Sequence, residues 1–292
     1  MKVVGQAKKR RDAHEKVTGS ALYIDDLRFP RTIYMKVLRA GVPHARILHI
    51  NTAQTEALEG VYKVISRNTP GIDQTIRIGT CIFDQPLMAF DKVRHAGEVV
   101  AVVVAKTPQL AEQAVKMIQV EYDELPFVLD PQEAASPQAP LIHENNGKYF
   151  HLPTFTPIPQ TNIFYHYELK KGTYQNVFAD AEIIVEEEFE YPLMNHAALE
   201  PHGCIARWDT TGELYLWSSS QAPFVLREVL AHIFQVPRHK IHVNIPYLGG
   251  GFGGKADLHL EYIPVLISMK LGGKPVKLLL NREEVFHYCY HR

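Results

Sequence analysis

The sequence predicts an α+β (mixed α/β) protein built from two structured regions. Residues 97–105 form a near-continuous run of β-branched and small side chains, which is typical of a strand buried on both faces. Prolines interrupt every periodic pattern between residues 126 and 159. Near the end of the chain, an alternating segment, a glycine-rich segment and a segment of helical spacing follow one another. These features place a proline-rich linker between two regions of mixed secondary structure.

The first region spans residues 19–129 and follows an N-terminal arm of residues 1–18. Alternating and β-branched patterns predict its strands, at residues 22–24, 32–40, 44–50, 61–65, 97–105 and 119–122. Helical patterns predict helices at residues 52–58 and 108–118, and Thr107 is placed to cap the second of them. Because strand, helix and strand follow one another over residues 97–122, this part resembles a crossover unit of an α/β sheet.

The second region spans residues 164–292 and follows a linker at residues 130–163. We expect the linker to run extended along the surface, because its prolines exclude a periodic element. Strands of the second region are predicted at residues 182–189, 204–208, 213–218, 239–247 and 275–280. A DTTG turn at residues 209–212 indicates a hairpin, and helices are predicted at residues 224–233 and 256–271.

Composition excludes several classes of function. The chain has 292 residues, 46% hydrophobic and 22% charged, with a formal net charge of −1. A nearly neutral chain lacks the basic field that nucleic acids and anionic membrane surfaces require. The widely spaced Cys81, Cys204 and Cys289 cannot by themselves form a four-cysteine iron–sulfur cluster, and they indicate no disulfide framework. With no secretory signal and no apolar run of membrane-spanning length, we expect a cytoplasmic protein.

The most informative segment is GGGFGGK, which runs from Gly249 to Lys255. Its glycines let backbone N–H groups approach a ligand at contact distance and make positive φ accessible. Ordering so flexible a loop is entropically costly, which favours a bound ligand over a purely structural glycine turn. A strand before the loop and a helix directly after it would bind an oxyanion, because uncapped N–H groups and the helix dipole favour negative charge.

Three kinds of anion-binding loop fit these glycines. Gly249, Gly254 and Lys255 match the nucleotide-hydrolase spacing G-x-x-x-x-G-K, but Ala256 stands where Ser or Thr must hold Mg²⁺. The dinucleotide-binding spacing G-x-G-x-x-G also matches, but that fold needs further βα units, and only nine residues follow Glu283. The third kind, a loop that wraps a cofactor or its oxo group within a larger domain, is therefore favoured.

Two further features supply candidate site residues. The segment Glu200–Pro201–His202 is either a turn with local hydrogen bonds or part of the same ligand site as the glycine loop. Gln221 lies where a predicted strand meets a helix, and its amide can donate and accept hydrogen bonds, although simple solvent exposure is the alternative. The fifteen histidines show no H-E-x-x-H spacing, and no G-x-S-x-G motif is present. The residues alone therefore indicate a cofactor site and leave the reaction type open.

Several segments, in their order and spacing, resemble the molybdenum hydroxylase family of xanthine dehydrogenases and aldehyde oxidoreductases. The opening of that family's molybdopterin-binding subunit resembles RRDAHEKVTGSALYIDDLRFP. Its hammerhead α/β domain resembles VPHARILHI, DKVRHAGEVVAVVVA and IQVEYDELPFV. The first part of its molybdenum-binding domain resembles LEPHGCIARWD, SSSQAPFVLREVL and GGGFGGK. The resemblance covers nearly the whole chain and implies a hammerhead-like α/β domain followed by the first, incomplete part of a molybdopterin-binding α/β domain.

The resemblance also implies cofactor contacts. The amide of Gln221 would hydrogen-bond the molybdenum oxo group, and the same group would lie against the backbone of Gly250, Gly251, Phe252 and Gly253. Donors aimed at that group stabilise the negative charge that builds during hydride transfer. The pterin would hold the molybdenum, with no direct metal ligand from the protein.

Two departures from the family pattern bear on substrate and activity. Purine-oxidising members place a glutamate directly after the lysine of the loop, where this chain has Ala256. An aldehyde or a differently bound N-heterocycle is therefore expected, with Glu200 and Ala256 as candidates for the substrate pocket. The family's general base is a glutamate farther downstream, so we expect no catalytic residue in this chain and no turnover by the chain alone.

Partners and cofactors follow from the same resemblance. Molybdopterin, alone or as a dinucleotide, would be the bound cofactor, and a second polypeptide would complete the molybdenum domain. Iron–sulfur and FAD subunits, with [2Fe-2S] clusters and FAD, would carry the electrons away. Both a natural split subunit and a truncated product fit the sequence. The alternative function is a non-catalytic remnant or assembly module that retains the fold.

Overall fold

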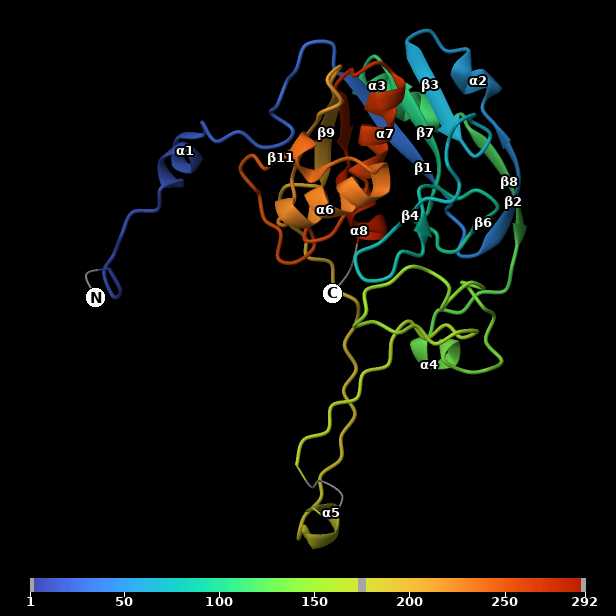
Figure 1. The fold of residues 1–292 in the computed structure, drawn as a ribbon, viewed down its shortest axis with the longest axis vertical. Coiled ribbons are helices and arrows are strands. Elements are labelled where there is room, and N and C mark those ends of the chain that lie inside the picture. The colour runs from blue at the N-terminus through green and yellow to red at the C-terminus, as the bar shows by residue number, and fades with distance from the viewer. Residues whose placement is uncertain (1–2, 173–176, 290–292) are drawn as a thin grey trace.

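A seven-stranded mixed sheet forms the centre of the molecule, seen in a computed structural model that describes residues 3–172 and 177–289 (Figure 1). Its strand order is β11-β10-β9-β12-β1-β7-β3. The strands are β1 (Ile33–Arg39), β3 (Val61–Ser66), β7 (Val99–Ala105), β9 (Gly203–Trp208), β10 (Leu214–Ser218), β11 (Ile241–Asn244) and β12 (Val276–Leu279). Because β1 pairs with β7 on one side and with β12 on the other, the two predicted regions contribute to one sheet and one buried core.

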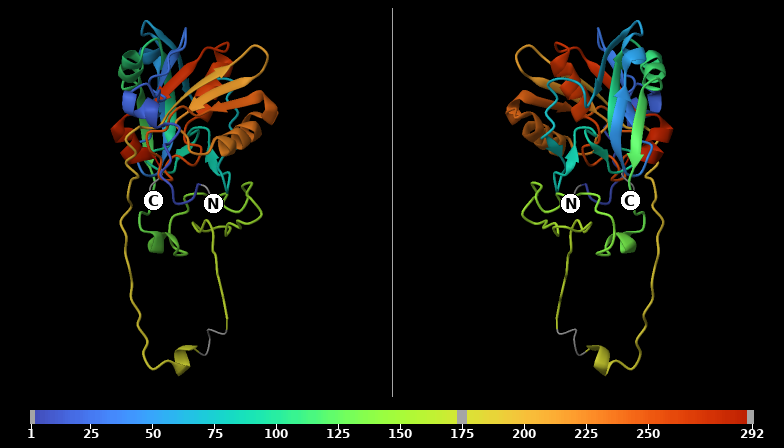
Figure 2. Two further views of the ribbon diagram at one scale, coloured as in Figure 1. Left: turned by 90° about the vertical axis from the view of Figure 1, so that its left-hand side faces the viewer. Right: turned by 90° about the vertical axis from the view of Figure 1, so that its right-hand side faces the viewer.

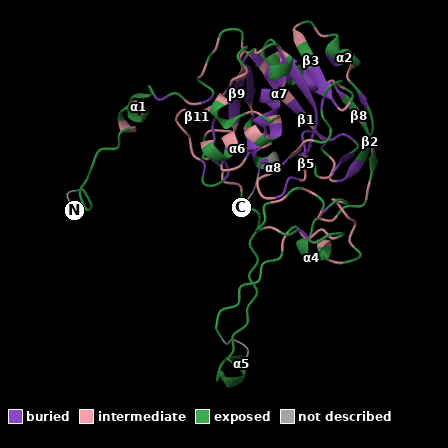
Figure 3. Ribbon diagram, in the orientation of Figure 1, coloured by how far each residue is buried: buried purple, intermediate pink, exposed green. Residues whose placement is uncertain are grey.

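The most deeply buried strand is β7, in which all seven residues are inaccessible to solvent, as its β-branched run predicts. It pairs with β1 and β3, and α3 (Pro108–Val115) packs on β1 and β7. The side chain of Thr107 accepts a hydrogen bond from the N–H of Leu110, which confirms the predicted start of α3. Figure 3 shows the buried centre of the sheet in purple.

Two smaller sheets and a short helix complete the first region. They comprise β2 (Ala45–Asn51), β6 (Lys92–Val93) and β8 (Gln119–Glu124) in the order β6-β2-β8, the pair β4 (Arg77–Ile78) and β5 (Gln85–Pro86), and α2 (Ala53–Glu56). Because β7 and β8 lie in different sheets, the predicted crossover unit is wrong. The polar residues of β8 suit a partly exposed strand that pairs antiparallel with β2, not a neighbour of the fully buried β7.

The second region supplies the other half of the large sheet. β9 and β10 form the predicted antiparallel hairpin, and β11 continues the sheet in parallel with β10. Helix α6 (Pro223–Phe234) packs on β11, and α7 (Tyr262–Lys270) packs on β9 and β12. Helix α8 (Arg282–Tyr288) begins at a capping box formed by Asn281 and Glu284.

The helix predicted at residues 256–271 begins only at Tyr262, so the glycine loop does not open directly into a helix. Pro264 explains the late start, because a proline is tolerated in the first turn of a helix but not in its interior. The Glu261 carboxylate also binds the backbone N–H groups of His259 and Leu260, which fixes the turn before the helix. The predicted anion-binding helix N-terminus is therefore wrong, although the loop itself is present.

Two predicted strands are shortened or missing. The segment at residues 239–247 forms β11 only over Ile241–Asn244, because a 3₁₀ turn at Arg238–Lys240 precedes it. Residues 22–24 form no strand. The carbonyl oxygen of Leu22 accepts from Tyr247, and the N–H of Ile24 donates to Glu200, so no continuous ladder develops.

The linker is folded on itself rather than extended. It contains α4 (Pro131–Ala134), which begins at the capping side chain of Asp130. The buried side-chain amide of Asn146 donates to the backbone carbonyls of Ile158, Thr161 and Ile163, which draws the linker into a small lobe below the sheet (Figure 1). Side-chain hydrogen bonds of this kind cannot be inferred from proline content.

A long excursion, residues 164–194, leaves the body of the molecule and carries α5 (Val177–Asp180) at its far end (Figures 1 and 2). The strand predicted at residues 182–189 does not form. Figure 2 shows the two sides of the excursion far apart, so neither provides a neighbour for the other. A strand is stable only when its backbone groups pair, so the alternating pattern here has no ladder to join.

The N-terminal segment carries a short exposed helix, α1 (Ala13–Thr18). Among the described residues, no helix combines the length and the apolar composition needed to cross a bilayer.

Candidate functional site

The glycine loop, Gly249 to Lys255, connects β11 to the turn before α7 and adopts backbone angles that few residues other than glycine tolerate. Gly250 and Gly253 have φ of 97° and 95°. Phe252 also has a positive φ, 54°, and its side chain is 68% exposed. A bulky residue held in the left-handed region stores strain, which is common where a loop is shaped for a ligand.

Gln221 is fastened to this loop by three hydrogen bonds. Its side-chain Oε1 accepts from the N–H of Gly253 at 3.0 Å and from the N–H of Lys255 at 3.2 Å. Its own backbone N–H donates to the carbonyl oxygen of Lys255 at 2.8 Å. The absence of a side chain at Gly251 is required, because a Cβ there would lie 2.3 Å from Cδ of Gln221.

These bonds fix the orientation of the Gln221 amide. Since Oε1 faces two N–H donors of the loop, the NH₂ group points the other way and bonds to no other described residue. The backbone N–H groups of Gly250, Gly251 and Phe252 likewise donate to no described residue. The loop and Gln221 therefore present a set of hydrogen-bond donors that suits a negatively polarised ligand such as an oxo group.

A buried ion pair anchors the ends of the loop. Lys255 Nζ lies 3.0 Å from Oε2 of Glu200, and the two side chains are 1% and 10% exposed. The same Oε2 accepts from the N–H of Gly249 at 2.9 Å, and the other oxygen accepts from Ile24. Burial lowers the pKa of Lys255, and the neighbouring carboxylate opposes this shift. Glu200 thus lies beside the loop, but its contacts are those of a residue that holds the loop in shape.

Two histidines hold the loop at Gly254. Nε2 of His202 and Nε2 of His259 lie 2.8 Å and 2.9 Å from the carbonyl oxygen of Gly254, so each ring donates there. Their rings meet edge to face with centroids 4.4 Å apart. Burial lowers the pKa of both histidines to about 4, which keeps the rings neutral at neutral pH.

The thiol of Cys289 adjoins this pair, with Sγ 3.4 Å from Nδ1 of His202. One ring nitrogen of each histidine and this sulfur lie within 4.8 Å of one another, a grouping that could hold a metal ion. Burial raises the pKa of Cys289 to about 11, so the thiol is protonated and can donate to His202. Hydrogen bonding accounts for the contact between the thiol and His202 without an ion.

The structure brings most of the predicted site residues together. Gln221, Gly251, Gly253 and Glu200 meet at the loop, and Ala256, half-buried, donates its N–H to Gly253. The sequence analysis missed three supporting groups: the pairing of Lys255 with Glu200, the histidine pair, and the buried carboxylate of Glu261, which accepts from Ser218. The Glu200–Pro201–His202 segment gave a partial signal, but His259 and Glu261 join the site only through tertiary contacts.

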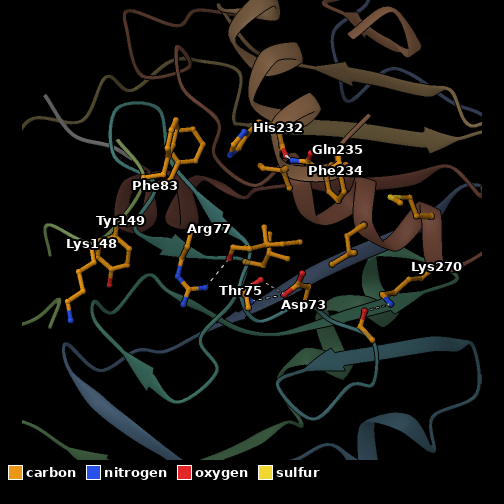
Figure 4. A pocket seen from close by; sticks show the side chains of 17 residues that line it. Asp73, Thr75, Arg77, Phe83, Lys148, Tyr149, His232, Phe234, Gln235 and Lys270 are labelled. Atoms are coloured by element: carbon orange, nitrogen blue, oxygen red, sulfur yellow. Dashed lines mark hydrogen bonds between the residues drawn. The ribbon is translucent and has the colours of Figure 1, made fainter. Parts of the chain in front are cut away.

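The largest cavity of the described chain, about 770 Å³, lies elsewhere. Figure 4 shows Phe83, Tyr149 and His232 on one side and Asp73 and Lys270 on the other. None of its lining residues belongs to the glycine loop or to the other predicted site residues. The predicted cofactor site is thus an exposed wall and not an enclosed cavity.

Two family models match the chain. The molybdopterin cofactor-binding domain matches residues 155–292. The a/b hammerhead domain of aldehyde oxidase and xanthine dehydrogenase matches residues 18–126. The glycine loop, Gln221 and Glu200 all lie within the first of these matches.

Curated relatives share about a third of their residues with this chain. A probable xanthine dehydrogenase subunit of Bacillus subtilis is 34% identical over 94% of this chain and 34% of its own length. The nicotinate dehydrogenase large molybdopterin subunit of Eubacterium barkeri is 33% identical over 97% of this chain and 62% of its own length. This chain therefore spans only part of each of these relatives.

Solved structures give the same result. The CO dehydrogenase of Oligotropha carboxidovorans superposes with a TM-score of 0.87 at 31% identity, over 98% of this chain and 36% of that one. Quinoline 2-oxidoreductase of Pseudomonas putida 86 gives 0.84 at 32% identity, over 98% and 36%. The aldehyde oxidoreductase of Desulfovibrio gigas gives 0.82 at 26% identity, over 97% and 31%.

Proposed function

We propose that this chain, which belongs to the molybdenum hydroxylase family, forms the oxo-side wall of a molybdopterin site in an enzyme that oxidises an aldehyde or an N-heterocycle with water-derived oxygen. The chain contains the family's molybdopterin cofactor-binding domain and its hammerhead domain. The observation that supports the proposed wall is the orientation of Gln221, whose carbonyl oxygen is held by the loop and whose NH₂ group is left to donate.

The residues of the chain would act by positioning and by electrostatics. The N–H groups of Phe252 and its neighbours and the amide of Gln221 would donate to the oxo group of the cofactor, and so stabilise charge that develops there. Bound molybdopterin would supply the redox chemistry. Glu200 and Lys255 would keep the loop from relaxing, since they fix its two ends from below. The general base, in this proposal, lies in sequence outside this chain.

The substrate class is inferred from one residue of the loop and from relatives. Ala256 stands where purine-oxidising members place a glutamate, which argues against a purine. Relatives named for nicotinate, for quinoline and for aldehydes favour an N-heterocycle or an aldehyde. Glu200 and Ala256 remain candidates for the substrate pocket, Ala256 because it follows the loop directly.

Partners follow from the fraction of the family fold that this chain provides. It spans 34% of the Bacillus subtilis relative and 36% of the Oligotropha carboxidovorans chain. We propose that a second polypeptide completes the molybdenum domain, and that iron–sulfur and FAD subunits accept the electrons. A cytoplasmic complex with molybdopterin, free or as a dinucleotide, is the form that we expect.

Two substitutions of Gln221 separate donation from loop support. Gln221→Glu keeps an oxygen for the N–H groups of Gly253 and Lys255 but loses the NH₂ donor, whereas Gln221→Ala loses both functions. In the complex purified from its source, we expect both variants to lower kcat by about 100-fold, the range seen when one oxyanion donor is removed. Only Gln221→Ala should also lower the molybdenum content and the Tm.

The outcome that contradicts the proposal is a Gln221→Glu complex that turns over at the wild-type rate. Metal analysis of the native complex provides a second, independent readout. A complex that contains no molybdenum would support the remnant or assembly module instead.

A further inference from the structure

The excursion at residues 164–194 exposes apolar side chains that nothing in the described chain covers. Over residues 182–194, which we call the acidic limb, large apolar residues recur at every odd position except 187. Each of these side chains is more than two thirds exposed: Ile183 81%, Val185 76%, Phe189 71%, Tyr191 80% and Leu193 82%. An apolar surface of this extent on a soluble protein marks an interaction site.

The opposite face of the acidic limb is charged. Its even positions include four glutamates, at residues 182, 186, 188 and 190. Alternation of this kind is the pattern of a strand with one buried and one solvated face. Yet none of the backbone groups of the acidic limb hydrogen-bonds to another described residue outside it. The limb therefore has the side-chain pattern of a strand and lacks only the neighbouring strand.

We infer that the acidic limb becomes a β-strand by pairing with the polypeptide that completes the molybdenum domain, and that this pairing brings that polypeptide to the glycine loop. The inference rests on the proposed function, because it names the surface by which the proposed partner docks. Strand addition of this kind uses main-chain hydrogen bonds for affinity and alternate side chains for specificity.

Charge indicates which partner fits. The limb carries five glutamates between residues 182 and 190, the fifth being Glu187. Pairing with the same limb of a second copy would set like charges opposite one another, which is destabilising. A strand with an apolar face and with Lys or Arg on its other face would satisfy both sides of the limb. The family fold beyond this chain's own share supplies such a partner in the proposed complex, whereas a homodimer through this limb is disfavoured.

The acidic limb leads directly into the site. Three residues after Leu193, the ring of His196 lies so close to the loop that a Cβ on Gly254 would be 2.7 Å from its Nδ1. A Cβ on Gly250 would likewise lie 3.3 Å from that of Ala198. Residues 196–198 thus pack on the glycine loop. A polypeptide paired along the limb would therefore reach the edge of the proposed cofactor site, where the general base is needed.

Adjacent isoleucines provide a matched pair of variants. Ile183 belongs to the apolar face and Ile184 to the acidic face, and both are exposed. Ile183→Glu would place a charge in the proposed interface, while Ile184→Glu makes the same chemical change on the solvated face. A tagged chain, expressed in its source, would be purified with the polypeptide that carries the downstream family segment, identified by mass. We expect Ile183→Glu to lower the recovery of that polypeptide at least about tenfold, and Ile184→Glu to change it by less than about twofold.

Hydrogen exchange of the same samples gives a readout that is independent of recovery. In the wild-type complex, amides of the acidic limb should exchange at least about 100-fold more slowly than in the isolated chain. Equal recovery with both variants, together with unprotected limb amides in the complex, would overturn the docking surface and leave the proposed function standing. If no polypeptide with the downstream family segment accompanies the wild-type chain, the proposed partner and this docking surface both fail.

Discussion

The glycine loop and the acidic limb differ in where their backbone groups find partners. At the loop, N–H groups of Gly249, Gly253 and Lys255 are bound by side chains, and the carbonyl oxygen of Gly254 receives two histidines. In the acidic limb, residues 182–194, no backbone group bonds to another described part of the chain. The loop is preorganised before any ligand arrives, whereas the limb requires a partner for its structure. Substitutions should therefore affect the isolated chain strongly at the loop and weakly at the limb.

Loss of the buried lysine should have the largest effect on stability. Lys255→Met leaves the carboxylate of Glu200 almost buried without its cation, which costs about 3–5 kcal/mol when one partner of a buried pair is removed. Chemical denaturation of the isolated chain measures this loss. The double variant Lys255→Met/Glu200→Gln should recover much of it, because no unpaired charge remains.

An exposed pair serves as the control for this variant. Lys116→Met breaks the pair with Glu112, whose side chains are 72% and 51% exposed, and should change the unfolding free energy by less than about 1 kcal/mol. Equal losses for Lys255→Met and Lys116→Met would show that the loop is not anchored as described.

A methyl group at Gly251 tests the contact between the loop and Gln221. Gly251 has no positive φ, so the backbone accepts alanine, but the new Cβ would overlap the Gln221 side chain. We expect Gly251→Ala to cost about 1–3 kcal/mol, the usual range for overpacking. It should also displace the Gln221 amide, which a change in its side-chain NMR resonances would report. Unaltered Gln221 resonances would contradict the close approach of the two residues.

Acid should loosen the loop through its two histidines. Burial lowers the pKa of His202 and His259 to about 4, so between about pH 6.5 and pH 4 the unfolded chain binds more protons than the folded one. The contribution of these residues is therefore complete above about pH 6.5 and is lost as the pH falls. The loss is at most about 1.4 kcal/mol per histidine and pH unit.

Denaturation midpoints at pH 7, 6 and 5 measure this slope. Substituting both His202 and His259 by Asn should flatten it, whereas His239→Asn, at an exposed position, should leave it unchanged. A slope that is the same in all three proteins would remove the histidines from the account.

The smallest effect is expected in the acidic limb. Ile183→Glu and Ile184→Glu should each alter the unfolding free energy of the isolated chain by less than about 0.5 kcal/mol, because neither side chain is buried in the described structure. A loss of 2 kcal/mol or more for Ile183→Glu would show that the limb packs on the chain itself.

Local chemistry predicted the elements whose signals are local. The run in β7 predicted its burial, Thr107 predicted the start of α3, and DTTG predicted the hairpin of β9 and β10. The resemblance to the family is confirmed by the two matched domains. These features succeed because side-chain period, capping and turn chemistry act over a few residues.

The misses depend on contacts between distant segments. The sheet joins β1 to β12 across more than 240 residues, which no local pattern encodes. The acidic limb has the alternation of a strand but no neighbour, and α7 starts late because Pro264 and Glu261 override its helical spacing. Within the site, Gln221 and the glycines came from the resemblance, whereas His259 was missed because only the folded chain brings it to Gly254.

The most direct test is a cryo-EM structure of the native complex with its cofactor bound. The account predicts that Nε2 of Gln221 and a backbone N–H near Phe252 lie within hydrogen-bond distance of an oxygen ligand on molybdenum. A map in which Gly249 to Lys255 faces solvent, far from any molybdenum, would contradict it.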